Sequence, residues 1–348
     1  MKGRIVVLDR WNGRPAAALV ADGWLLDLLV DPPSDAGTGP GAIHRAIADR
    51  PVKGQNGFIL KLGNGQTGFL RQGRGIAPGD RLLVQVATWA EAGKAAPVTT
   101  RLLFKGRFAI ITPGAKGRNI ARSIKDEATR DRLAELAHEA LLNAPEDFGA
   151  IIRSAATEVD DGLIAAELHD LRQLAEQVLA DAAGEAELLV DGPDAHHLAW
   201  RDWTDPVPDQ VFDRDGSFAE HGVLEMIDAL QTPFVPLTGE ASMFIEATRA
   251  LVAVDVNTGG DFSFAAGLKA NLAAARDLPR QLRLRGLGGQ VVIDFAPVGK
   301  KDRLSIEQVL TRALRADAID TNIVGWTPLG HLELQRKRER LPLAVALA

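Results

Sequence analysis

Two aspartates in the last third of the chain follow apolar runs that otherwise exclude charge. The first run is LVAVDV (251–256), which carries Asp255, and the second is QVVIDF (290–295), which carries Asp294. Asn257 stands two residues beyond Asp255, where a continuing strand would direct its side chain to the same side. Carboxylate and amide oxygens are ligands that suit a hard cation. These residue types and their spacing predict a metal site.

A helix-length stretch separates the two apolar runs, so we expect a strand–helix–strand unit. If the strands are parallel neighbours, their C-terminal ends lie at the same sheet edge, where open α/β sheets bind ligands. Two adjacent carboxylates repel each other unless a cation or a shared proton lies between them. Mg²⁺ fits such a pair, because it takes the rest of its shell from water and phosphate, and it could promote phosphodiester cleavage.

Two other interpretations of these segments stay open. Each aspartate could simply end its strand by capping a turn or the helix that follows. GLGG (286–289) could be taken for a nucleotide-binding loop, but it lacks the glycine spacing of those motifs and precedes a strand rather than a helix. We expect it instead to end the preceding helix.

Length and composition limit the class of protein. A chain of 348 residues predicts two or more modules, and 46% hydrophobic with 25% charged residues is typical of a globular protein. The absence of cysteine excludes disulfides and thiolate metal sites and fits a reducing cytoplasm. No apolar run is long enough to span a membrane. The net charge of −6 gives no overall attraction to nucleic acid, and we expect the basic clusters at 280–285, 300–303 and 336–340 to be solvated surface.

Hydrophobic periodicity divides the chain into a strand-rich first part and a mixed second part. Strands are expected within 2–30, 56–71, 78–90 and 98–114, with a loop at 31–42, and this density of short strands suggests a small barrel. Later segments predict helices at 123–144, 160–183, 218–231, 264–285 and 302–317, with strands at 148–156, 186–193, 243–257 and 290–295. Pro279 should kink the fourth helix or begin a fresh turn. The stretch 196–216 gives no clear prediction.

Two segments resemble a known family. RQLRLRGLGGQVVIDF (280–295) is similar to the most distinctive segment of the ribonuclease E/G family, and TRALVAVDVNTG (248–259) resembles the segment that precedes it there. In that family the two aspartates hold a catalytic Mg²⁺ and the asparagine assists. The resemblance therefore implies that Asp255 and Asp294 hold the metal, and that Asn257 positions the metal or the scissile phosphate.

The resemblance also implies an α/β multidomain fold. The family has a ribonuclease-H-like scaffold split by an OB-type RNA-binding barrel and an α/β sensor module, followed by a DNase-I-like catalytic domain. The corresponding ranges are 1–40 with 188–231 for the scaffold, 41–103 for the barrel, 104–187 for the sensor module and 232–348 for the catalytic domain.

The resemblance assigns RNA contacts to three residues of the barrel. Phe58 and Phe69 match positions whose rings stack on RNA bases, and Lys94 matches a basic contact. Stacking on aromatic rings in a positively charged groove is how such barrels hold single strands. The alternative for both phenylalanines is core packing, which is the favoured interpretation for Phe58 taken alone.

A sensor for a 5′-monophosphate is implied by GAIIRSAA (149–156). Arg153 and Ser154 match an Arg-Thr pair of the family, and a guanidinium with a hydroxyl suits a terminal phosphate. Gly106 and Ile110 match positions that line the same pocket. The alternative for Arg153 is a surface ion pair.

The chain departs from the family pattern in several places. The paired cysteines that hold a zinc between subunits are absent, so no zinc is expected and a homodimer would form without a zinc link. The loop after Asn257 is short, and Pro328 stands where the family usually has an arginine.

The leading hypothesis is a cytoplasmic, Mg²⁺-dependent endoribonuclease that cuts single-stranded RNA and favours 5′-monophosphorylated ends. The departures motivate a second hypothesis, an RNA-binding protein of the same family with weak or lost nuclease activity. A third, an Mg²⁺-dependent phosphohydrolase acting on small nucleotides, would not need Phe58, Phe69 or Lys94.

Overall fold

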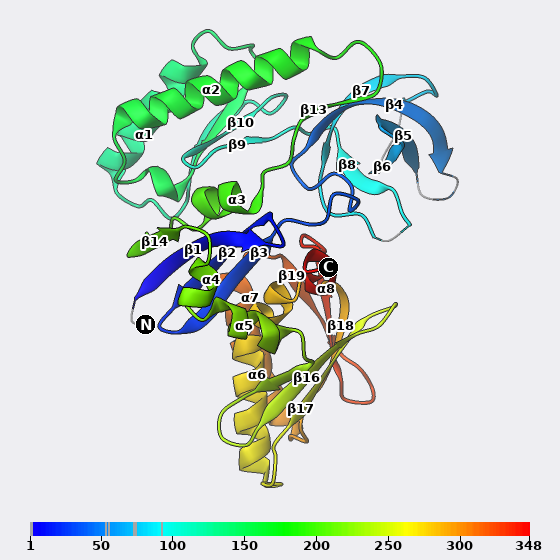
Figure 1. The fold of residues 1–348 in the computed structure, drawn as a ribbon, viewed down its shortest axis with the longest axis vertical. Helices are drawn as coiled ribbons and strands as arrows, with labels where there is room; N and C mark the ends of the chain where they lie inside the picture. The colour runs from blue at the N-terminus through cyan, green and yellow to red at the C-terminus, as the bar shows by residue number, and fades with distance from the viewer. Residues whose placement is uncertain (1–2, 53, 55, 72–74, 92) are drawn as a thin grey trace. The chain divides into compact units, whose positions relative to one another are not determined.

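The computed structural model describes residues 3–52, 54, 56–71, 75–91 and 93–348, and the chain forms two compact units. The first unit joins Met1–Pro33 to Gln210–Ala348, and the second is Ser34–Asp209. Figure 1 shows the elements of both along the chain. No helix in these ranges is long and apolar enough to cross a membrane.

The first unit begins with three hairpin-linked strands, within the range 2–30 in which strands were predicted. They are β1 (Arg4–Trp11), β2 (Arg14–Ala21) and β3 (Trp24–Val30), and β14 (Gln210–Asp213) joins β1 in parallel. Asn12–Gly13 and Asp22–Gly23 make both tight turns with positive φ angles, which is the conformation that two-residue hairpins favour. The parallel partner, β14, comes from the stretch without a clear prediction.

One face of this sheet packs against short helices. They are α4 (Ser217–Glu220), α5 (Val223–Leu230) and α8 (Leu343–Ala346), which bury Phe218, Ile227 and Leu343. The single helix predicted for 218–231 is wrong, because Gly222 adopts the left-handed conformation (φ 67°) and separates α4 from α5.

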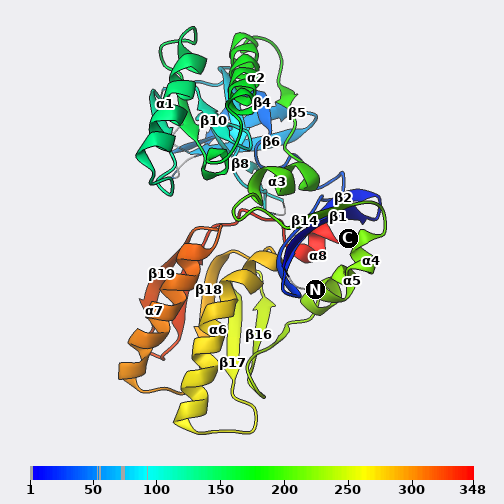
Figure 2. The ribbon, with the colours of Figure 1, turned by 90° about the vertical axis from the view of Figure 1, so that its left-hand side faces the viewer.

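The second sheet of this unit contains the predicted strand–helix–strand unit. Its order is β15 (Phe234–Pro236), β16 (Ser242–Ala247), β17 (Val252–Asn257), β18 (Gly289–Asp294), β20 (Leu332–Arg336) and β19 (Thr321–Trp326). Only β17 and β18 run parallel, which confirms the prediction for this pair. Figure 2 shows α6 (Phe264–Leu284) and α7 (Lys300–Ala316) side by side on one face.

Helix α6 has the predicted ends but is not broken at Pro279. Ser263 caps its first turn by accepting a hydrogen bond from the Ala266 N–H (3.2 Å), and Gly286 follows its end with φ 64°. The helix continues through Pro279 to Leu284. Pro279 is buried inside the continuous helix, so no fresh turn begins there, and a kink at this residue stays a prediction.

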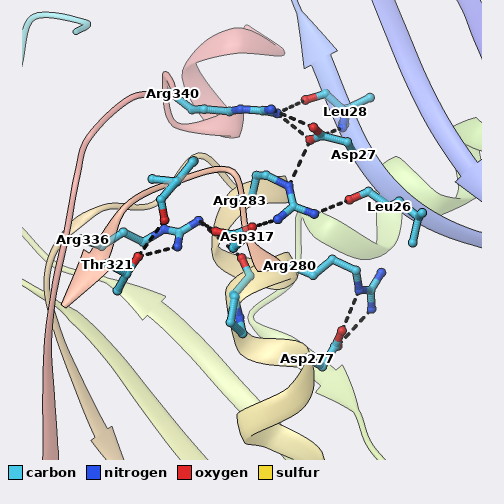
Figure 3. A network of polar contacts seen from close by, with 12 residues as sticks. Leu26, Asp27, Leu28, Asp277, Arg280, Arg283, Asp317, Thr321, Arg336 and Arg340 are labelled. Atoms are coloured by element: carbon cyan, nitrogen blue, oxygen red, sulfur yellow. Dashed lines mark hydrogen bonds and ion pairs between the residues drawn. The ribbon is translucent and has the colours of Figure 1, made fainter. Parts of the chain in front are cut away.

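A network of buried charges joins the two sheets of the first unit (Figure 3). Arg283 of α6 contacts Asp27 of β3 and Asp317, which directly follows α7. Arg336 of β20 pairs with Asp317 at 2.7 Å, and Arg340 pairs with both oxygens of Asp27 at 2.6 and 2.8 Å. The expectation of solvated surface is wrong for these arginines, because Arg336 is 1% exposed and the Arg283 side chain 14%.

The second unit begins with a closed barrel. Five strands close it, with β4 (Ile43–Val52) pairing to both β5 (Gly57–Gly63) and β7 (Arg81–Val86). The remaining members are β6 (Gln66–Arg71) and β8 (Ala96–Thr99), and β13 (Glu187–Val190) adds to the outside of β4. Leu60 and Val84 are fully buried inside. A closed barrel of five strands is consistent with the predicted OB-type domain.

A four-stranded sheet under two helices follows the barrel. The strands lie in the order β11 (Gly117–Ile120), β12 (Gly149–Ile152), β10 (Ala109–Thr112) and β9 (Phe104–Lys105). The helices α1 (Glu127–Leu141) and α2 (Asp161–Ala180) cover it, and α3 (Ala195–Asp202) comes later in the chain. The mixed α/β class is confirmed, whereas the ribonuclease-H-like and DNase-I-like descriptions and the four domain boundaries stay predictions.

Candidate functional site

The two aspartates lie side by side. Asp255 and Asp294 are direct partners in the parallel register of β17 and β18. Neighbouring strands lie about 4.8 Å apart, so the two side chains leave the sheet as close neighbours. Both residues are exposed. The predicted juxtaposition is confirmed.

Alternation along the strands directs both carboxylates away from the helices. Val254 and Val256 of β17 are buried under α6 and α7, whereas Asp255 and Asn257 are exposed between and beyond them. Ile293 and Asp294 alternate in the same way on β18. Because successive strand residues point to opposite faces, the carboxylates lie on the sheet face that the helices leave uncovered.

A further polar side chain lies next to each aspartate. The Asn257 amide donates a hydrogen bond from Nδ2 to Asp255 Oδ2 at 2.7 Å. His331 Nε2 lies 3.7 Å from Asp294 Oδ1, on a turn in which the His331 N–H donates to Thr327 Oγ1. His331 was not predicted from the sequence, because it lies on a later strand connection and no residue spacing relates it to Asp294.

The donor set fits Mg²⁺. It consists of two adjacent carboxylates, and an all-oxygen pair of this kind leaves room for the water and phosphate ligands that Mg²⁺ prefers. Across the ranges that the structure describes, no group of three or more His, Cys, Asp or Glu forms a metal cluster. Asp255 and Asp294 are the carboxylates that would hold such a metal.

Asn271 fixes the chain directly after Asp294. Its side chain is fully buried in α6, donates from Nδ2 to the Ala296 carbonyl (2.8 Å) and accepts at Oδ1 from the Ala296 N–H (3.0 Å). Gly267, one turn earlier, lies against the same segment, since an added Cβ would come within 3.0 Å of the Pro297 carbonyl oxygen. Helix α6 therefore positions the end of β18.

The barrel residues differ in their surroundings. Phe58 is 6% exposed and packs in the barrel core, which favours the core-packing interpretation for this residue. Phe69 is partly buried, and its ring lies over Gly57, where an added Cβ would meet it at 2.4 Å. Lys94 is exposed, and its Nζ pairs with Glu91 at 2.9 Å. Contacts of Phe69 and Lys94 with RNA stay predictions.

The structure brings together Arg153 and Gly106 of the predicted sensor. Arg153 donates from Nη1 to the Gly106 carbonyl at 2.7 Å and to the Arg201 carbonyl at 3.3 Å. Ile110 lies on β10, in register with the β12 residue Ile151. Ser154 begins a short 3-10 helix directly after Arg153.

The Arg153 guanidinium forms an ion pair with a carboxylate that was not predicted from the sequence. Asp202 Oδ1 accepts from Arg153 Nη2 at 2.8 Å, and both Asp202 oxygens accept from Arg201, at 3.0 and 2.7 Å. Burial raises the pKa of Asp202, but hydrogen bonds and charges from Arg201 and Arg153 outweigh it and leave this pKa below its ordinary value. Asp202 is therefore ionised at neutral pH. Arg153 thus forms an ion pair in this structure, which is the alternative that the sequence suggested for it.

A second carboxylate orders the turn beside Gly106. Glu167 of α2 accepts hydrogen bonds from the backbone N–H groups of Arg107 (2.8 Å), Phe108 (2.6 Å) and Ala109 (2.9 Å). An added Cβ at Gly106 would lie 2.4 Å from the Glu167 carboxyl carbon. Glycine at this position allows the carboxylate to approach the turn.

Comparison with known proteins identifies the family of the chain. The sequence profile of the Ribonuclease E/G family matches residues 104–218 and 210–339. The chain belongs to the ribonuclease E/G family. The matched ranges contain both aspartates, Arg153 and Asp202, whereas the barrel strands β4–β8 precede them.

Individual relatives are ribonucleases of this family. The chain is 29% identical over 329 residues to ribonuclease E of Synechocystis sp. (strain ATCC 27184 / PCC 6803 / Kazusa), covering 82% of this chain and 48% of that protein. It is 28% identical over 307 residues to ribonuclease G of Escherichia coli (strain K12), covering 76% and 61%. A chloroplastic ribonuclease E/G-like protein of Arabidopsis thaliana is 27% identical over 315 residues, covering 76% and 31%.

The chain spans about half the length of the curated ribonucleases E that it matches. The family and these relatives carry the name ribonuclease.

Proposed function

We propose that this chain is an Mg²⁺-dependent endoribonuclease that cuts single-stranded RNA. The observation that carries the proposal is the register of Asp255 with Asp294 on the uncovered face of the sheet, within a family of ribonucleases. The cysteine-free sequence is compatible with a cytoplasmic location, which is part of the proposal. The proposal also includes a homodimer that forms without a zinc link.

In this proposal Asp255 and Asp294 are the residues that would hold the cation. When bound, Mg²⁺ would supply Lewis acidity and lower the pKa of a bound water. Asn257 fixes the orientation of Asp255 through its 2.7 Å hydrogen bond. Asn271 fixes the exit of β18 behind Asp294. The uncovered sheet face leaves both carboxylates accessible to an extended phosphodiester backbone.

The 5′ end of the RNA would bind in the second unit. Arg153 and Ser154 provide a guanidinium and a hydroxyl for a terminal monophosphate, and Gly106 and Ile110 border the same region. Asp202 already pairs with Arg153, so a phosphate must compete with this carboxylate. Phe69 and Lys94 of the barrel would contact the strand.

The test is cleavage of a short single-stranded RNA by Asp255→Asn and Asp294→Asn. Each variant should lose roughly 100-fold or more of the rate, because metal stabilisation of the transition state is worth several kcal/mol. Glu246→Gln is the matched control, since Glu246 is an exposed carboxylate on the neighbouring strand β16. EDTA should abolish cleavage. RNA with a 5′-monophosphate should be cleaved faster than the same RNA with a 5′-hydroxyl. Wild-type rates in both aspartate variants would refute the metal assignment.

RNA binding without cleavage is the second candidate function. It is motivated by the departures from the family pattern, which are the missing cysteine pair, the short loop after Asn257 and Pro328. It predicts salt-dependent RNA affinity that EDTA does not change. It also predicts that neither wild type nor the aspartate variants yield cleavage products.

A further inference from the structure

An exposed tryptophan lies beside the predicted 5′-phosphate site. Trp200, in the last turn of α3, is 48% exposed, although tryptophan is usually well covered. The guanidinium carbon of Arg107 lies 5.1 Å from its ring centroid. The His197 ring lies 5.6 Å away at a tilt of 48°. Three groups from two segments therefore build a partly open aromatic surface.

Arg107 brings an unpaired positive charge to this surface. Its backbone N–H is held by Glu167, but its side chain forms no ion pair with any carboxylate that the structure describes, and its Nε is buried without a hydrogen-bond partner there. Arg107 also directly follows Gly106 in the chain. The cation therefore joins the Trp200 ring to the turn that borders the phosphate site.

The last turn of α3 also contacts Arg153 directly. Arg153 donates hydrogen bonds to the carbonyl of Arg201 and to the carboxylate of Asp202, the two residues that follow Trp200. The aromatic ring and the guanidinium proposed to bind phosphate are thus held by consecutive residues of one helix.

We propose that Trp200 and Arg107 form a stacking surface for the 5′-terminal base of a single-stranded RNA. The inference rests on the proposed function, because it places the terminal phosphate of the same nucleotide at Arg153. An aromatic face accepts every base, and a guanidinium beside it strengthens both stacking and phosphate attraction.

Charge favours a nucleic acid over a protein surface as the occupant. Arg107, Arg153 and Arg201 gather around this end of α3, and Asp202 is the carboxylate that pairs with two of them. A nucleotide supplies both a planar base for the ring and an anionic phosphate for the arginines. An apolar protein partner would supply only the first.

The experiment uses the full chain in EDTA with a short single-stranded RNA that carries 2-aminopurine as its first base. Fluorescence quenching reports stacking of that base, and titration gives the affinity. The variants are Trp200→Ala, Trp200→Phe and Arg153→Gln. Trp24→Ala is the matched control, because Trp24 is 66% exposed and has Arg280 at 5.5 Å from its ring, but belongs to the other unit.

Trp200→Ala should weaken binding of the 5′-monophosphorylated RNA roughly 10-fold and abolish the quenching, in the range that stacking of one base supports. Trp200→Phe should retain most of both signals, and Trp24→Ala should match wild type. Unchanged affinity and quenching in Trp200→Ala would overturn the stacking surface, whatever Arg153→Gln does.

The two proposals can fail separately. If Arg153→Gln and a 5′-hydroxyl RNA leave affinity unchanged while Trp200→Ala still abolishes quenching, the stacking surface is supported and the phosphate site is overturned. If wild type neither binds nor quenches the probe, both are overturned.

Discussion

At the scale of single residues, the neighbours of a functional group decide what it can bind. Arg153 has the guanidinium that a phosphate sensor needs, yet Asp202 already accepts a 2.8 Å hydrogen bond from it. Charge-assisted pairs of this kind are stronger than neutral hydrogen bonds, so an incoming phosphate must displace or share this partner. Asp294 likewise has His331 within 3.7 Å.

Asp202→Asn should strengthen the preference for 5′-monophosphorylated RNA. The amide can still accept from Arg201 but no longer competes as an anion for Arg153. Because the Asp202 side chain is 39% exposed, the expected gain is moderate, roughly twofold to tenfold. The measurement is the ratio of affinities for 5′-monophosphate and 5′-hydroxyl RNA. Asp161→Asn, which removes the ion pair with Arg132 in the same unit, is the control, and an unchanged ratio in Asp202→Asn contradicts the prediction.

At the scale of elements, helix α6 both covers β17 and β18 and fixes the segment beyond Asp294. Its small residues allow close approach, since Ala270, Ala274 and Ala275 are almost completely buried against the sheet. Asn271, in the same turn, instead forms two hydrogen bonds with the backbone of Ala296. A buried polar residue in mid-helix is stable here because the backbone groups of Ala296 satisfy its amide.

Asn271→Ala should lower both stability and cleavage. It leaves the N–H and C=O of Ala296 without this partner, and two buried unsatisfied groups cost about 2–6 kcal/mol of the free energy of unfolding. Urea denaturation measures that loss. The cleavage rate should fall by more than the decrease in folded protein explains, because Asp294 is displaced. Lys269→Ala, at an exposed position of α6, should change the free energy by less than about 0.5 kcal/mol. Equal stability of the two variants would rule out the positioning role.

At the scale of the whole first unit, buried arginine–aspartate pairs connect the N-terminal sheet to the sheet that carries the candidate site (Figure 3). Arg283 lies between Asp27 and Asp317, and Arg340 pairs with Asp27. Removing one partner of a buried pair leaves the other charge buried without a partner. This typically lowers the free energy of unfolding by about 3–5 kcal/mol. The segments 280–285 and 336–340 thus include residues of the interior rather than a surface for nucleic acid.

The Asp27 pairs should make the stability of the protein depend on acid pH. Burial raises the pKa of Asp27, but Arg340 and Arg283 outweigh it and hold the pKa below 3.8. The ionised pairs therefore stabilise the fold fully above pH 3.8, and this contribution is lost as the pH falls through the lower, folded-state pKa. Asp27→Asn should cost about 3–5 kcal/mol at neutral pH, with a difference from wild type that shrinks in acid.

Urea unfolding at neutral and at acid pH measures this difference. Asp320→Asn is the control, since its pair with Lys337 is exposed (3.1 Å) and should contribute less than about 1 kcal/mol. A difference between wild type and Asp27→Asn that stays constant with pH would show that the Asp27 pairs do not titrate as described.

The sequence by itself determined the features that depend on local periodicity. Apolar runs around Asp255 and Asp294, joined by a helical stretch, predicted two parallel neighbouring strands, and β17 and β18 pair in that way. The short apolar runs within 2–30 likewise predicted strands, and β1, β2 and β3 lie there. These predictions succeed because strand alternation, helix periodicity and the handedness of crossovers leave few arrangements of such a unit.

The tertiary structure alone decided which distant residues meet. Asp202 reaches Arg153 across 49 positions, and Arg340 reaches Asp27 across 313. Neither pair leaves a periodic signal, because the separation along the chain carries no information about which loops and helix ends pack together. Packing also decides whether a basic residue lies at the surface. A cluster of arginines belongs to the interior when packing removes it from water and supplies carboxylate partners.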